Sequence, residues 1–472
     1  MKKFLVTLVL LLIWMSVTAQ TTFIVDGINY MTTSVSTVEV TYGGIYNGDI
    51  TIPSTVLYSG VSYTVSSIGN TALQKSSGLT SIKIPSSVTT IGNYAFNLCS
   101  SLTSITIPSS LTSIGNYAFN ECSGLTSITI PSSVSSIGQY AFRRCTSLTS
   151  IEIPSSVTLI GNGAFSGCSV LSSINIPSSV TSIGEFTFES CSSLTSITIP
   201  LNVITIGQNA FYGCSGLTSI IIPSSVISIG RYAFYGCSGS TSITIPSTVT
   251  LIEIGAFFAC TGLKQFIVDS NNFNYSSFEG VLFNKKRTTL YSYPNSKSSE
   301  YAIPSFVKTI GYAAFQDCSS LYSITIPPSV GQLGDGVFKN CTRLSEIHCQ
   351  IDTTLLIDPT FFISVDKNTC KLYVPMGLSG LYFEAVGWSD FTNIIEEDLT
   401  AVKIIKTSNV NVYSEQNEIV VKGAGLGETI YVYTTMGTLV KTIKATNDVR
   451  INVPSNQIYL VKIADKTFKM VL

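Results

Sequence analysis

The segment from Cys99 to Cys122 reads CSSLTSITIPSSLTSIGNYAFNEC, and close variants of it recur along the chain. Its cysteine returns at a constant interval of 23 residues. The positions are Cys99, Cys122, Cys145, Cys168, Cys191, Cys214, Cys237 and Cys260. A fixed period of roughly 20 to 50 residues indicates one structural unit stacked on copies of itself. The sequence therefore predicts a solenoid whose function lies on a repeated surface, not in a single pocket.

Each repeat combines three patterns. Ile105 and Ile107 alternate with polar residues, which is typical of a strand with one buried face, and Pro108 ends that strand. Gly115 predicts a sharp turn with a positive φ. The apolar residues from Ala118 to Cys122 have nearly helical spacing, which predicts a short helical turn with its apolar side inward. In stacked coils, identical residues would form ladders with a spacing of about 4.8 Å.

Leu79 to Cys99 and the following repeats fit the pattern L-x-x-I-x-I-P-x-x-V-x-x-I-G-x-x-A-F-x-x-C almost letter for letter. This pattern resembles the bacterial BspA-like class of leucine-rich repeats. The resemblance covers about Val65 to Cys349. It implies a curved solenoid of parallel strands with short helical turns, secreted or displayed on a cell surface and associated with adhesion. It does not name a ligand.

The repeat is interrupted once. The interval from Cys260 to Cys318 is 58 residues, which indicates an insertion around 264–300. We expect a β-hairpin there that turns around Asn284 to Arg287. Single residues also depart from the pattern in the first coil and near the insertion: Leu73, Ser76, Ser240 and Glu253, the last in the place of the turn glycine.

The N-terminus predicts a secretory signal. Lys2 and Lys3 precede an apolar run of about 14 residues, and we expect cleavage after Ala19. Because the run is shorter than the roughly 20 residues that span a bilayer, we expect no transmembrane anchor in the mature protein.

The remaining segments are assigned from their alternation of apolar and polar residues. We expect a β-rich N-terminal cap over 20–64, the solenoid over 65–350, and a degenerate last coil with a C-terminal cap over 351–398. In that last coil Leu372 and Val374 should point inward, and Trp388 and Phe391 should plug the core. Short strands over 399–472 predict a small antiparallel β-sandwich.

The C-terminal segment shows a second resemblance. Stretches such as Tyr431-Val-Tyr-Thr-Thr-Met-Gly437 resemble the sorting domains that type IX secretion recognises, although Val412-Tyr-Ser-Glu stands where a Tyr-Pro-Asn-Pro motif often opens such domains. The resemblance implies secretion machinery as a partner and the surface of a Gram-negative bacterium as the location.

Twelve cysteines behind a signal peptide would usually indicate disulfides. Neighbouring coils would bring cysteines within disulfide range. A cysteine repeated once per coil beside Phe is better explained as a small buried apolar residue, so we expect a reduced ladder. Cys349 and Cys370 depart from the ladder position and are the better disulfide candidates.

Signals for chemistry are sparse. His348 is the single histidine, so we expect no catalytic triad and no His-based metal site, and we expect His348 on the surface of a strand. The segment Asp269 to Asn272 could hold Ca²⁺, but an Asx turn is favoured. No phosphate loop or basic groove is apparent, and only four basic residues occur from Lys83 to Cys260, so the repeats offer no basic footprint for nucleic acid. We expect no cofactor and no enzyme activity.

Two surface features are binding candidates. The outward strand positions form a Ser/Thr face varied by charged and amide residues, and aromatic residues recur just after the turn glycine. The alternatives are a solvated strand face and rings that only cover neighbouring coils. The candidate residues are Tyr94, Tyr117, Tyr140, Phe186, Tyr232, Thr106, Thr129, Glu152, Asn175 and Thr198.

The sequence thus favours an adhesin-like binding protein of the cell surface, with a repeated face that engages a host matrix protein, another cell or a glycan. A structural role is the alternative, in which the Ser/Thr lattice organises water, including an ice-binding variant, or packs against like molecules in a surface layer. An enzyme that uses the repeats for targeting is a third possibility, but no stretch of catalytic size is left for it.

Overall fold

The computed structural model describes residues 20–398, 411–415, 418–422, 424, 429–435, 437–446, 448–454, 457–463 and 466–471. The predicted signal segment lies outside these residues. The chain forms two compact units: a solenoid unit, Met1–Tyr373 with Gly380–Ile394, and a C-terminal unit, Val374–Ser379 with Ile395–Leu472. Within the described residues, no helix is both long and apolar enough to cross a membrane.

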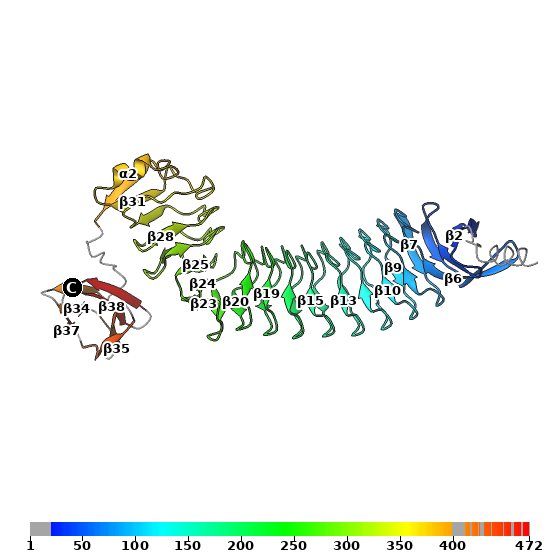
Figure 1. The fold of residues 1–472 in the computed structure, drawn as a ribbon, viewed down its shortest axis with the longest axis horizontal. Coiled ribbons are helices and arrows are strands. Elements are labelled where there is room, and N and C mark those ends of the chain that lie inside the picture. Colours follow the sequence, from blue (N-terminus) through cyan, green and yellow to red (C-terminus); the bar gives the residue numbers. More distant parts are fainter. Residues whose placement is uncertain are drawn as a thin grey trace, which may run out of the picture. The chain divides into compact units, whose positions relative to one another are not determined.

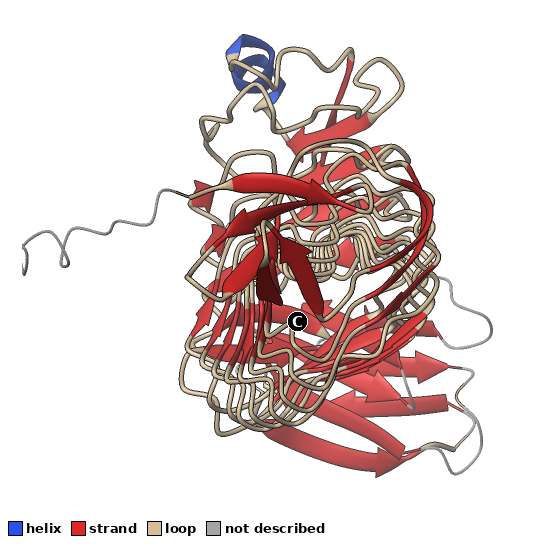
Figure 2. Ribbon diagram, turned by 90° about the vertical axis from the view of Figure 1, so that its right-hand side faces the viewer, coloured by secondary structure: helices blue, strands red, loops and turns tan. Residues whose placement is uncertain are grey.

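Most regular coils contribute two short strands, and the strands of successive coils lie side by side in parallel (Figure 1). The first strand leg, which contains the Ile-x-Ile-Pro pattern, comprises β4 (Asn47–Thr51), β7 (Gly78–Lys83), β9 (Ser104–Thr106), β12 (Ser150–Glu152), β14 (Ser173–Asn175), β16 (Ser196–Thr198), β18 (Ile220–Ile221), β20 (Ser242–Ile245) and β22 (Gln265–Val268). The second strand leg comprises β3 (Thr37–Val40), β6 (Val61–Ile68), β8 (Thr90–Ile91), β10 (Ser113–Ile114), β11 (Ser136–Ile137), β13 (Leu159–Ile160), β15 (Ser182–Ile183), β17 (Thr205–Ile206), β19 (Ser228–Ile229) and β21 (Leu251–Ile252). Viewed along the stack, these strands superimpose, with loops and turns between them (Figure 2). The predicted solenoid of parallel strands is confirmed.

The third part of the coil, which we call the turn leg, is not helical. Its N–H groups alternate between two acceptors: Cys99 donates to Phe96 O within its own coil at 3.1 Å, whereas Phe96 donates to Ala118 O of the next coil at 2.7 Å. Tyr94 and Leu98 have positive φ values of 57° and 65°. A helix keeps all these bonds within one segment and needs negative φ throughout. The turn leg is therefore a third ladder between coils, made of consecutive turns.

The turn glycine has a different role from the one expected. Gly115 does not have the positive φ that the sequence suggested, since that conformation falls two residues later, at Tyr117. A Cβ atom on Gly115 would instead lie 2.5 Å from the carbonyl carbon of Gly92 in the preceding coil. Glycine is needed here because neighbouring coils approach too closely for a side chain.

The core is a set of ladders. Consecutive Phe rings stack with centroids 5.1 Å apart for Phe96–Phe119 and 5.3 Å apart for Phe119–Phe142. Each ladder cysteine is buried, and its thiol donates to a backbone carbonyl one coil back, as Cys122 does to Phe96 O and Cys99 does to Leu73 O, both at 3.1 Å. Many coil-repeated hydroxyls also bridge coils, as Ser156 does to Val134 O at 2.7 Å. Serine and threonine thus supply bonds between coils as well as solvated surface.

The N-terminal segment is rich in β structure. Strands β1 (Thr22–Val25), β2 (Ile28–Thr32) and β3 form an antiparallel edge, and β5 (Thr55–Tyr58) forms a hairpin with β6. Strands β3 and β4 already pair in parallel with β6 and β7. The parallel ladder therefore begins inside the segment expected to be the cap.

The insertion forms an antiparallel meander of β23 (Tyr275–Phe278), β24 (Val281–Asn284) and β25 (Thr289–Ser292). The predicted hairpin is confirmed: Arg287 N donates to Asn284 O at 2.9 Å in the turn between β24 and β25. Coils resume when β25 pairs in parallel with the next second-leg strand. The later strands are β26 (Glu300–Ala302), β27 (Thr309–Ile310), β28 (Ser323–Ile326), β29 (Gln332–Leu333), β30 (Glu346–Cys349), β31 (Lys371–Pro375) and β32 (Asn393–Glu397).

The end of the solenoid unit is closed by large side chains. Trp388 is fully buried, and its indole Nε1 donates to Leu355 O at 2.9 Å. Phe391 and Leu372 are also buried, as expected for a plug and for an inward strand residue. The short helix α2 (Ser379–Glu384) lies between these segments in sequence.

The C-terminal unit contains two antiparallel sheets. One consists of β33 (Asn411–Glu415), β34 (Glu418–Lys422) and β37 (Asp448–Asn452), and the other of β35 (Thr429–Thr434), β36 (Leu439–Lys444), β38 (Ile458–Ile463) and β39 (Lys466–Val471). Buried residues from both sheets, such as Ile419 and Val432, form a single core cluster. The predicted β-sandwich is confirmed.

Candidate binding surfaces

The candidate residues on the first strand leg form a row across the coils. Glu152 pairs with Asn175, and Asn175 with Thr198, as Cα partners of adjacent parallel strands. Thr129 joins the row through a bridge to Glu152, whereas Thr106 pairs with Lys83 of the preceding coil. All five candidates are exposed. Glu152, Asn175 and Thr198 also line an open depression of ≈380 Å³ together with the neighbouring Ser150, Ser173 and Ser196.

The candidate aromatic residues lie on the turn leg. Tyr94, Tyr117 and Tyr140 stack with centroid distances of 4.8 and 4.9 Å. The Tyr140 ring covers Gly163 of the next coil, where a Cβ atom would lie 2.1 Å from a ring carbon. Burial raises the pKa of Tyr117, and the neighbouring Tyr140 and Tyr94 add to the shift. The rings therefore form one continuous stack that also covers backbone.

The structure does not bring all the predicted residues together. The Tyr stack lies on the turn leg, whereas the Glu152 row lies on the first strand leg. Phe186 and Tyr232 occupy the aromatic position of later coils, but Gly163 and Asn209 take that position in between. The candidates thus divide into two surfaces and two separate rings.

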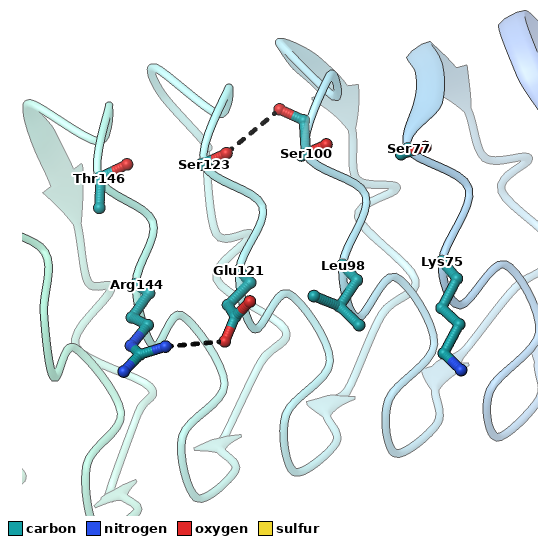
Figure 3. A pocket seen from close by; sticks show the side chains of 8 residues that line it. All are labelled: Lys75, Ser77, Leu98, Ser100, Glu121, Ser123, Arg144 and Thr146. Atoms are coloured by element: carbon teal, nitrogen blue, oxygen red, sulfur yellow. Dashed lines mark hydrogen bonds and ion pairs between the residues drawn. The ribbon is translucent and has the colours of Figure 1, made fainter.

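A third surface was not predicted from the sequence. An open groove of ≈490 Å³ crosses four coils on the turn leg and the residues after it (Figure 3). It is lined by Lys75, Ser77, Leu98, Ser100, Glu121, Ser123, Arg144 and Thr146. The Arg144 guanidinium lies 3.2 Å from the Glu121 carboxylate one coil away. The signal was the residue just before the cysteine position, which changes from lysine (before Ser76) to leucine, glutamate and arginine (before cysteines) in successive coils.

The twelve cysteines are all buried and unpaired. Burial raises the pKa of Cys168 and Cys214 to about 12. Cys349 and Cys370 are not joined, because the register of β30 and β31 places Cys349 beyond one end of the paired residues and Cys370 beyond the other. The Cys349 thiol instead lies 3.3 Å from the Tyr382 hydroxyl. Burial disfavours the thiolate, which is the nucleophilic form of cysteine.

Comparison with known families gives a direct match. The family described as "BspA type Leucine rich repeat region (6 copies)" matches residues 66–194, 158–284 and 286–375, which together exceed half of the chain. The chain belongs to the BspA-type leucine-rich repeat family. The regular coils, the turn glycine and the Phe and Cys ladders described above are thus the BspA-type repeat of this chain.

Solved structures also match the chain. A leucine-rich repeat protein from Bacteroides ovatus is 30% identical, and the match covers 69% of this chain and 94% of that chain with a TM-score of 0.50. A leucine rich cell surface protein from Faecalibacterium prausnitzii is 25% identical over 80% of this chain and 95% of that chain, with a TM-score of 0.48. None of the curated proteins matches the chain.

The structure shows the surroundings of His348 and of the segment from Asp269 to Asn272, the two polar sites considered from the sequence. His348 is not on the surface as expected: it is only 7% exposed, because the Tyr373 ring stacks on it at 4.4 Å. The Asx turn is confirmed, since Asn271 N donates to Asp269 Oδ1 at 2.8 Å. Asn272 is buried, donates to Pro246 O and Val249 O, and accepts from two backbone N–H groups. Among the described residues, no group of three His, Cys, Asp or Glu side chains is placed to hold a metal ion.

Proposed function

We propose that this BspA-type protein is a secreted, surface-displayed binding protein whose repeated faces engage an extracellular protein or glycan. The observation that carries the proposal is the row Thr129, Glu152, Asn175 and Thr198, which offers different side chains at one-coil spacing on an open face. A rigid ladder loses little conformational freedom on binding, so several weak contacts can act together. Export is supported by the signal pattern that ends at Ala19.

We assign no enzyme activity to the chain. The thiols are buried, and the single histidine is buried with the Tyr373 ring stacked on it. Binding requires neither group, and it suits a surface whose side chains vary from coil to coil on a constant backbone.

The test is binding of the mature protein to arrays of matrix proteins, glycans and whole cells. Glu152→Lys changes the first strand leg, and Tyr117→Ala changes the Tyr stack. Tyr212→Ala is the matched control, because Tyr212 also stacks on a neighbour, Tyr235, at 4.6 Å and is half-buried. Saturable binding that Glu152→Lys or Tyr117→Ala weakens, and the control leaves intact, supports the proposal. Failure to bind any member of the arrays contradicts it.

We also propose that the C-terminal unit addresses the chain to type IX secretion machinery. Its separate core and sheets support a module distinct from the repeats. In a host with that machinery, deletion of 399–472 should leave the protein in the periplasm, and fusion of 399–472 to a reporter should bring the reporter to the surface. Unchanged display after the deletion would contradict this role.

A further inference from the structure

The interruption of the repeats contains a cavity. It has a volume of ≈340 Å³ and is more enclosed than the surface depressions. Apolar and aromatic side chains dominate its lining, which includes Leu251, Ile254, Phe258, Leu282, Tyr291 and Tyr312. Pockets of about 300 Å³ or more with such walls are typical of specific binding sites. All of these residues belong to the solenoid unit.

The turn-leg ladder is broken at this cavity. In the preceding coil, Phe234 N donates to Ala256 O at 2.8 Å and Gly236 N donates to Phe258 O at 2.9 Å. The equivalent donors one coil later are Phe257 and Ala259, with Gly255 before them. Within the described part of the chain, no oxygen accepts a hydrogen bond from these three N–H groups. Gly255 and Phe257 line the cavity. The following turn leg contains Tyr293, which stacks on Phe315 at 5.0 Å and whose N–H donates to Ala314 O of the next coil at 2.8 Å.

The second strand leg is interrupted at the same place, and there a side-chain hydroxyl accepts the hydrogen bond that the next strand would have accepted. The sheet of β15, β17, β19 and β21 ends at β21. The Ile252 N–H at that edge donates to the Tyr275 hydroxyl at 2.9 Å. The fold therefore satisfies the exposed donor of the strand leg and leaves those of the turn leg open. A buried N–H without an acceptor is costly, so an acceptor from outside would be favourable here.

We infer that this cavity binds a short peptide segment of a partner protein between these two turn legs, the one that ends at Cys260 and the one that contains Tyr293. Alternate carbonyl groups of the segment would accept from Gly255 N and Phe257 N, as the carbonyls of the next coil do elsewhere. Addition of a peptide to an open ladder is a recurrent recognition mode, in which backbone bonds give affinity and side-chain pockets give specificity. The aromatic walls select a segment with small or aromatic apolar side chains. This site is separate from the rows of the proposed function.

The probe is a capped peptide with the sequence of residues 115–120, Gly-Asn-Tyr-Ala-Phe-Asn, which is a regular turn leg. The full mature chain is labelled with ¹⁵N-phenylalanine, and amide exchange is followed by NMR. Without the peptide, the Phe257 amide should exchange faster than the Phe234 amide. Saturating peptide should protect Phe257 and leave Phe234 unchanged. Unchanged exchange at Phe257, as expected for ordered water alone, overturns the inference.

Two variants locate the binding. Leu251→Trp fills the cavity and should abolish peptide binding. Leu159→Trp is its matched control, because Leu159 holds the same coil position and is similarly exposed, 56% against 47%, but does not line this cavity. If Leu251→Trp fails to fold, Tyr312→Ala removes one wall and should weaken binding, with the exposed Tyr322→Ala as control. Equal binding by a variant and its control overturns the inference, as does displacement of the peptide by neutral saccharides. Peptide binding that survives Glu152→Lys and Tyr117→Ala keeps this result distinct from the proposed function.

Discussion

The regular coils and the interruption differ in how the N–H groups and the aromatic rings of a turn leg are partnered. In the regular coils each turn leg passes its N–H groups to the next, and the Phe rings stack in parallel, as Phe211 and Phe234 do at 5.1 Å. At the interruption Phe257 meets Phe266 edge-on at 5.4 Å, and no hydrogen bond between described residues joins its turn leg to the following one, which contains Tyr293. In the regular coils, each turn leg is hydrogen-bonded to the next one, and the candidate sites described there are open surfaces. A break in the period is what creates an enclosed site.

The sharpest test of this comparison is the loss of one ring from each region. Phe142→Ala removes a fully buried ring between Phe119 and Phe165, and it should lower the free energy of unfolding by about 3–5 kcal/mol. Phe258→Ala removes a ring at the cavity, where space already exists, and it should cost less. Denaturant titrations followed by circular dichroism measure both. Equal losses would contradict the idea that the ladder is tightly packed only where it repeats.

A second test concerns the close approach of coils. Gly138→Ala would place a Cβ atom 2.5 Å from the carbonyl carbon of Gly115, and forcing the coils apart should cost about 1–3 kcal/mol in the free energy of unfolding. A Cβ atom added to Gly331 would meet no heavy atom within 4 Å, so Gly331→Ala should change stability by less than about 0.5 kcal/mol. Thermal melts compare the two variants. A harmless Gly138→Ala would show that the coils can separate without loss.

The sequence could predict the period, the inward isoleucines and the Phe and Cys ladders, because a repeated burial requirement leaves a repeated residue. It could not separate a helical turn from the turn leg. Ala118 to Cys122 have helix-like spacing, and only the positive φ at Tyr117 and Glu121 and the donors to the next coil distinguish the two. The Glu152 row follows from the period alone, since the register is one coil. The cavity depends on contacts that occur once, so no periodic signal could mark it.

The buried cysteines of the regular coils should make the free energy of unfolding depend on pH. Burial raises the pKa of Cys168 and Cys214 from 9.0 to about 12 in the folded chain. The unfolded thiols ionise above pH 9 while the folded ones stay protonated, so stability is full below about pH 9 and is lost as pH rises toward 12. Cys168→Ala should therefore make the fall in unfolding free energy shallower by about 1.4 kcal/mol per pH unit in that window. Urea titrations from pH 8 to 11 give the slopes, with the exposed Ser101→Ala as control; identical slopes would contradict the assignment.

The smallest expected effect lies on the outer surface of the same coils. Arg144 and Glu121 are one coil apart and 3.2 Å from each other, but the Arg144 side chain is 56% exposed. Water and salt screen such a pair, so a double-mutant cycle with Arg144→Ala and Glu121→Ala should give a coupling of about 0.5 kcal/mol or less. A coupling above about 1 kcal/mol would mean that the outer rows help to hold the coils together. A small coupling means that residues such as Lys75, Leu98, Glu121 and Arg144 can change from coil to coil without cost to the ladder beneath, which is the freedom that a binding surface on a repeated scaffold requires.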